Sequence, residues 1–143
     1  MVERVYNSLV AKSDEEKKVV LPRFFKTGKG QYGEGDVFIG VTVPNVREVA
    51  KEYKSLSLTD LSRLLQCEYH EMRLCALLIL VGNSKNVVTK EVFDFYLSNT
   101  ARINNWDLVD LSAPSIVGKY LLDKDRAVLY RLADSDLLWD NRI

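Results

Sequence analysis

The segment His70-Glu71-Met72-Arg73-Leu74-Cys75-Ala76-Leu77 decides the fold class of this chain. It opens with charged residues and leads into the longest apolar run of the sequence, which extends from Leu74 to Val81. Apolar residues at helical rather than alternating spacing indicate a buried helix. A helix that crosses a bilayer needs about 20 apolar residues, so this run is too short. We therefore expect a central buried helix over 69–82.

Apolar residues recur every three or four positions along nearly the whole chain, which predicts an all-helical protein. Ser13 and Glu16 form a capping-box pattern before 14–25, and Pro44 suits a first helical turn. A Gly-rich loop covers 28–40. The predicted helices are 2–12, 14–25, 44–54, 58–66, 69–82, 88–98, 105–111, 114–122, 124–133 and 136–143.

A weak internal repeat favours an α-solenoid of antiparallel helix pairs over a bundle. Arg73, Asp110 and Arg142 are 37 and 32 residues apart, close to one helix pair per step. Equivalent positions of a solenoid line one concave wall. We therefore predict one domain over 1–143 with these three side chains on one wall. The last helix ends in apolar residues without a polar capping repeat, so we expect further C-terminal repeats to be missing.

Charge and composition exclude several classes of protein. The 20 Lys and Arg residues balance 20 Asp and Glu residues, which argues against a strongly basic nucleic-acid or membrane binder. The first 30 residues are richer in basic side chains and could face phosphate. Two cysteines without CxxC spacing and a single histidine are too few to assemble a zinc site. Without a signal peptide or membrane segment, we expect a cytoplasmic protein that uses no metal.

Trp106 and Asp110 are the strongest candidates for a functional site. They lie one turn apart on one face of the predicted helix 105–111. An aromatic ring beside a carboxylate suits a cationic, ring-shaped ligand. Arg142, near the C-terminus, is expected to be their partner. The alternative is structural, because a Trp at a helix start often anchors packing and an Asp in the first turns complements the helix dipole.

The string from Gly28 to Gly33 matches the pattern GxGxxG but does not predict a dinucleotide site. No apolar strand precedes it, and no helix begins at its third glycine. Its backbone, with Lys26 and Lys29, could contact a DNA phosphate. A plain surface loop is the other interpretation, and both stay open.

Four further residues are interpreted as structural. Asp107 is expected to cap its helix, and Arg73 to bridge to a neighbouring carboxylate such as Asp110. His70 fits a helix N-terminus better than a general base. Trp139 is expected in the core.

Several segments together resemble the AlkD-like family of DNA alkylation repair enzymes, which are HEAT-repeat alkylpurine DNA glycosylases. They occur in the family's order from about residue 20 onward. The segments are Phe24-Phe25-Lys26-Thr27-Gly28-Lys29-Gly30-Gln31-Tyr32-Gly33-Glu34-Gly35-Asp36, Phe38-Ile39-Gly40-Val41 with Val43-Pro44 and Arg47, His70-Glu71 with Arg73 and Ala76-Leu77, Asn104-Asn105-Trp106-Asp107-Leu108-Val109-Asp110, and Leu138-Trp139 with Arg142.

The resemblance implies HEAT-like repeats and hydrolysis of the N-glycosidic bond of positively charged N3- or N7-alkylated purines in double-stranded DNA, without a cofactor. It implies that Asp110, Trp106 and Arg142 are catalytic. It places DNA contacts at Lys26, Lys29, Thr42 and Arg47. Two other hypotheses stay open: a non-catalytic HEAT-like module that binds DNA or a protein, and a scaffold that forms homo-oligomers through exposed C-terminal helices.

Overall fold

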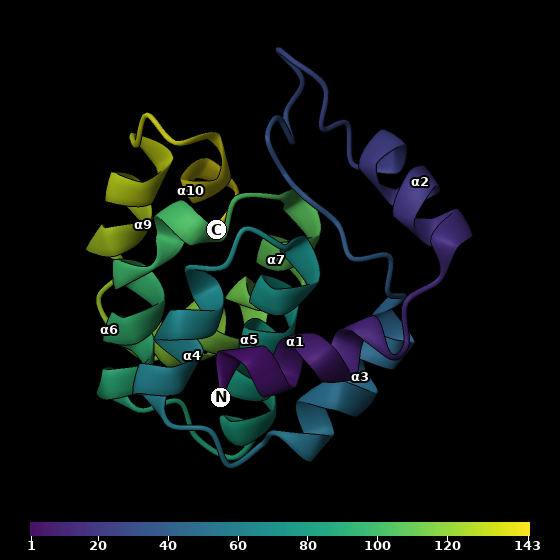
Figure 1. Ribbon diagram of the computed structural model, residues 1–143. Coiled ribbons are helices and arrows are strands. Elements are labelled where there is room, and N and C mark those ends of the chain that lie inside the picture. The colour runs from purple at the N-terminus through teal and green to yellow at the C-terminus, as the bar shows by residue number, and fades with distance from the viewer.

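The computed structural model describes residues 1–143 as a succession of short helices without strands (Figure 1). The helices are α1 (Val2–Val10), α2 (Glu15–Phe24), α3 (Val43–Glu52), α4 (Leu58–Leu65), α5 (His70–Asn83), α6 (Lys90–Ser98), η1 (Thr100–Arg102), α7 (Trp106–Asp110), η2 (Pro114–Gly118), α8 (Lys119–Leu121), α9 (Ala127–Ala133) and α10 (Leu138–Arg142). The prediction of an all-α, solenoid-like fold is confirmed.

Helix α5 is the centre of the stack. Every residue from 70 to 80 is buried, as expected for a helix that is apolar around most of its circumference. Helices α3 and α4 pack directly on α5, α1 lies across them, and α7 packs near the start of α5. The helix that the sequence predicts over 69–82 is observed over His70–Asn83. It is the frame on which the other helices are positioned.

Helix α2 stands beside the stack and buries none of its residues (Figure 1). Val19, Val20 and Phe24 are among its exposed apolar side chains. The predicted capping box at Ser13 is wrong. Asp14 is the N-cap, and its carboxylate accepts hydrogen bonds from the backbone N–H groups of Glu16 and Lys17. The Ser13 hydroxyl donates instead to a carbonyl at the end of α1.

Glu71 fixes the chain where it returns from α2 to α3. Its buried carboxylate accepts backbone N–H groups of Ile39, Gly40 and Val41 at 2.9, 2.7 and 3.0 Å. Gly40 has a φ of +96°, which a side chain rarely adopts. A Cβ atom at Gly40 would lie 2.8 Å from the carbonyl oxygen of Asp14. Glu71 and Gly40 therefore hold the start of α2 close to the body.

We expect Gly40→Ala to destabilise the protein by about 1 to 3 kcal/mol, because the methyl group meets backbone atoms and the positive φ becomes strained. Gly82→Ala is the matched control. It lies in α5 with nothing within 4 Å of the added Cβ, so stability should stay the same or rise by up to about 1 kcal/mol. Urea unfolding followed by circular dichroism measures both. Equal stability of the two variants would contradict this role of Gly40.

The C-terminal helices expose several large apolar side chains. Leu122, Tyr130 and Leu138 are 71%, 76% and 57% exposed. Self-association through this surface stays a prediction. None of the helices has the length and unbroken apolar character that a bilayer-spanning helix requires.

Candidate functional site

A pocket of about 330 Å³ lies between α2, the segment that follows it, α5 and α7. We call it the aromatic pocket because four aromatic rings besides His70 contribute to its wall. Its lining residues are Leu21, Phe24, Phe25, Phe38, Val41, Thr42, Val43, His70, Glu71, Leu74, Trp106, Asp107, Asp110 and Leu111. Elements from both halves of the sequence thus build a single hollow.

Trp106 forms one wall of the aromatic pocket. Asn105 caps α7 by accepting the backbone N–H of Trp106 at 2.9 Å, which fixes the start of this short helix. The indole stacks on Phe25 with ring centroids 5.3 Å apart and an angle of 28° between the planes. Phe24 meets the indole edge-on at 6.1 Å. The indole is therefore held by packing while it stays partly accessible.

Asp110 and Arg142 form a bidentate ion pair beside the indole. Arg142 Nε and a terminal guanidinium nitrogen donate to the two carboxylate oxygens at 2.7 and 2.8 Å. The hydrogen bonds and the charge of Arg142 hold the pKa of Asp110 below its ordinary value, so the carboxylate is ionised near neutral pH. The side chains of Asp110 and Arg142 are 41% and 49% exposed, so a ligand can reach both.

The family model described as DNA alkylation repair enzyme matches residues 5–143. The chain belongs to the DNA alkylation repair enzyme family. Neither the curated proteins nor the solved structures that were searched gave a match. Membership in this family indicates a role in the repair of alkylated DNA.

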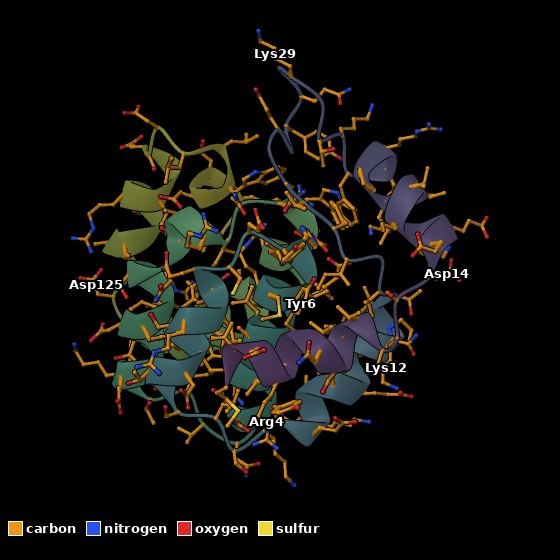
Figure 2. All side chains as sticks on the ribbon, viewed as in Figure 1. Arg4, Tyr6, Lys12, Asp14, Lys29 and Asp125 are labelled. Atoms are coloured by element: carbon orange, nitrogen blue, oxygen red, sulfur yellow. The ribbon has the colours of Figure 1, made fainter.

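In this DNA alkylation repair protein the four predicted DNA contacts lie in three places. Thr42 lines the aromatic pocket, and its hydroxyl makes no capping hydrogen bond to α3. Lys26 and Lys29 lie on the exposed loop after α2, and Figure 2 shows Lys29 at the tip of that loop, directed away from the body. Arg47 is exposed on α3 and lines a different pocket.

Two backbone N–H groups of the Gly-rich loop form hydrogen bonds within the loop itself. The N–H of Gly28 donates to the Gln31 side chain at 3.0 Å, and that of Gly30 donates to Glu34 at 2.9 Å. These two amides are therefore not free to bind a phosphate. The side chains of Lys26 and Lys29 would therefore make most of the contacts of this loop with DNA.

A buried ionic network lies behind the wall of the aromatic pocket. His70 donates from Nδ1 to Asp36 at 2.5 Å and from Nε2 to Asp107 at 2.6 Å. The same Asp36 carboxylate accepts Arg73 at 2.6 Å and the Asn105 amide at 3.1 Å. The network therefore ties the loop after α2 and the start of α7 to the central helix.

The charges in this network stabilise one another. Burial alone would lower the pKa of His70, but the hydrogen bonds and charges of Asp107 and Asp36 raise it to about 9. Burial alone would raise the pKa of Asp36, but His70 and Arg73 lower it below its ordinary value. At neutral pH the imidazolium and the Asp36 carboxylate are thus both charged.

Two sequence-based interpretations of this region are wrong. Asp107 is not the N-cap of α7. Asn105 is the N-cap, and Asp107, the second residue of the helix, accepts the Leu108 N–H with one carboxylate oxygen and binds His70 with the other. Arg73 does not share a wall with Asp110, because it is buried. Arg73 does bridge to a carboxylate, as a charged residue inside an apolar helix must, but the partner is Asp36 and not Asp110.

Trp139 is partly buried, packs against the core as expected, and also meets Tyr32 of the loop at 5.7 Å. No group of three or more His, Cys, Asp or Glu side chains is placed to hold a metal ion.

Proposed function

We propose that this protein is a DNA glycosylase that hydrolyses the N-glycosidic bond of positively charged N3- or N7-alkylated purines in double-stranded DNA. The observation that carries the proposal is the ionised Asp110 at the mouth of the aromatic pocket, next to the Trp106 indole. Membership in the DNA alkylation repair enzyme family supports a role of this protein in DNA repair. The proposed catalytic residues are Asp110, Trp106 and Arg142.

Alkylation at N3 or N7 makes the purine a good leaving group, because the bond electrons that pass to N9 neutralise the base. The sugar acquires positive charge at C1′ as the bond breaks. A carboxylate at Asp110 stabilises this charge through space. Water then adds its oxygen to C1′ and gives a proton to Asp110, which leaves a neutral free base and an abasic site. The reaction needs a positioned anion more than a strong acid.

Trp106 offers an aromatic surface to the cationic nucleotide. A cation over an indole gains on the order of 1 to 2 kcal/mol when water is excluded. The indole is prevented from turning away because it is stacked on Phe25.

Arg142 has two roles in this proposal. In the free protein it keeps Asp110 ionised and oriented through the bidentate pair. With DNA bound, its half-exposed guanidinium can turn to a backbone phosphate, for which its planar donors are well suited. The Asp110 carboxylate is then free to face the sugar.

The test is an excision assay on a duplex with a single N7-methylguanine. We expect the protein to release free 7-methylguanine, detected by mass spectrometry, and to leave an alkali-labile abasic site at that position. The same methylated duplex incubated without protein is the control for spontaneous depurination, and an unmodified duplex of the same sequence is the control for binding. If the protein binds both duplexes and releases no base above the spontaneous rate, it is a non-catalytic DNA-binding module instead.

A further inference from the structure

His70 lines the aromatic pocket but is closed to any ligand. Its side chain is 2% exposed, and both ring nitrogens are bound to carboxylate oxygens, Nδ1 to Asp36 and Nε2 to Asp107. An imidazole that donates from both nitrogens is the protonated imidazolium, which has no lone pair to accept a further proton. His70 therefore cannot act as a general base on DNA, and any part that it has in the reaction passes through other side chains.

Asp107 connects His70 to the helix that carries both proposed catalytic groups of the pocket wall. It lies between Trp106 and Asp110 on α7, a helix of five residues. Helices shorter than about 12 residues are marginal in water without tertiary contacts, so α7 depends on its attachments. One Asp107 oxygen accepts the N–H of Leu108 within α7, and the other binds His70 on α5. The imidazolium is thus the hydrogen-bond partner that the Asp107 carboxylate has outside its own helix.

A stack of aromatic rings connects His70 to the indole by a second route. The imidazole lies on Phe38 with ring centroids 4.6 Å apart and contacts Phe25 at 4.9 Å. Phe25 stacks in turn on Trp106 at 5.3 Å. A cation is attracted to the face of an aromatic ring, so the imidazolium also holds these rings in place. One buried side chain therefore supports both the indole and the helix on which Asp110 lies.

The charged groups around His70 come from three elements. Asp36 faces it from the loop after α2, and Asp107 faces it from α7. Glu71 and Arg73 are its charged neighbours along α5. Both are engaged elsewhere, because Arg73 binds Asp36 and Glu71 accepts three backbone N–H groups before α3. The imidazolium is therefore the group that joins the loop, α5 and α7 at one point.

Loss of one proton from the imidazolium would break this junction. A neutral ring has one N–H group and can donate to only one of the two carboxylates. Asp36 is fixed by Arg73 and by the Asn105 amide, so it cannot withdraw from a ring nitrogen that has no proton. Asp107 has no comparable second anchor on another element. We therefore expect the bond between α7 and the ring to be the one that is lost.

We infer that His70 is a positioning residue of the proposed reaction, whose imidazolium holds α7 so that Trp106 and Asp110 face the bound nucleotide together. This inference rests on the proposed function for the reaction that His70 serves. It assigns to His70 an effect on the rate of base release from the protein–DNA complex. The affinity for DNA depends instead on side chains that DNA can reach.

The test uses Asp107→Asn, which keeps the size of the side chain and removes a charge that faces the imidazole. Leu9→Ala is the matched control, because it destabilises the core from α1, outside the aromatic pocket. The two variants and the reference protein all carry Trp139→Phe, so that Trp106 is the only indole. The rate of 7-methylguanine release is measured at saturating protein over a range of pH on both sides of the pKa of His70. Circular dichroism at each pH gives the folded fraction, by which each rate is divided.

At neutral pH we expect Asp107→Asn to release the base about 10 to 100 times more slowly than the reference protein, since a misplacement of about 1 Å can have this effect. Its affinity for the duplex, measured by fluorescence anisotropy, should stay within about threefold. In the reference protein the rate should fall as pH rises through about 9, to which the two carboxylates raise the pKa of His70. In the variant this fall should occur about one to three pH units lower, because one carboxylate is missing.

The control decides between a positioning role and a purely structural one. Leu9→Ala should keep the rate per folded molecule and the pH profile of the reference protein. An Asp107→Asn protein with the same rate and pH profile as Leu9→Ala overturns the inference. If Asp107→Asn does not fold, the reference protein decides. A rate per folded molecule that stays constant as pH rises through about 9 then excludes the positioning role of His70.

A second readout separates this inference from the proposed function. Acrylamide quenching of Trp106 fluorescence reports how accessible the indole is, whether or not a base is released. Quenching should increase as pH rises through about 9 in the reference protein, and at lower pH in Asp107→Asn. If this increase is seen while no 7-methylguanine is released, the proposed function fails and the support of Trp106 by His70 stands. If quenching does not change with pH, His70 does not hold the indole, and the inference is wrong.

Discussion

Asp110→Asn should reduce the single-turnover rate of 7-methylguanine release by a factor on the order of 10² to 10⁴. Asparagine keeps the shape of the side chain but carries no charge to stabilise the sugar cation and takes no proton from water. The stability cost should stay below about 1 kcal/mol, because the Asp110–Arg142 pair is half-exposed. Rapid-quench assays with protein in excess over DNA measure the rate.

Asp94→Asn is the control for this experiment. Asp94 also belongs to an exposed ion pair, with Lys90 on α6, but it lies outside the aromatic pocket. Its substitution should leave the rate unchanged. An Asp110→Asn protein that excises the base at the parental rate would show that another group performs the chemistry, and the proposed catalytic role would be withdrawn.

Asp36→Asn should destabilise the protein by about 3 to 5 kcal/mol. The substitution leaves the buried charges of His70 and Arg73 without their shared carboxylate, and neither side chain can reach water. The control is Asp123→Asn, which removes a carboxylate that is paired with Lys124 and 84% exposed, and it should leave the stability essentially unchanged. Urea unfolding compares the two. Similar costs for both variants would rule out the network as a major source of stability.

The same network predicts how stability depends on pH. The pKa of His70 is raised from 6.5 to about 9, so its contribution is complete below pH 6.5 and is lost as pH rises through about 9. The pKa of Asp36 is lowered from 3.8, so its contribution is complete above pH 3.8 and is lost on further acidification. The contributions of these two groups to the free energy of unfolding are therefore both complete between pH 3.8 and 6.5, where we expect stability to be greatest.

This dependence can be checked on the unmodified protein even if Asp36→Asn does not fold. NMR titration of the single imidazole should give a midpoint near 9, and urea unfolding should show falling stability between pH 6.5 and 9. A midpoint at or below the ordinary value of 6.5 would mean that the imidazole is not held between two carboxylates.

The central part of the fold could be predicted from the sequence because its signal is strong. The apolar run after Arg73 determines a buried helix, and the observed bounds of α5 differ from the predicted ones by one residue at each end. Short helices near the C-terminus were harder to delimit. The helix predicted over 124–133 begins only at Ala127, because the residues before it form a turn.

The sequence also indicated which residues of the site would meet. Helical spacing predicted that Trp106 and Asp110 share a face, and the ion pair of Asp110 with Arg142 brings the third residue to the same place. Their catalytic roles stay predictions. The contacts of Asp36 with His70 could not be derived from spacing, since they join a loop to a helix 34 residues away.

Helix α2 has a consequence for how a complex would form. A helix that buries no side chain can lose its hydrogen bonds by local opening, without unfolding of the core. Its amide protons should exchange with solvent long before those of α5. A ligand that binds in the aromatic pocket, between α2 and the body, must also immobilise α2. The conformational entropy that α2 loses then weakens the binding of that ligand.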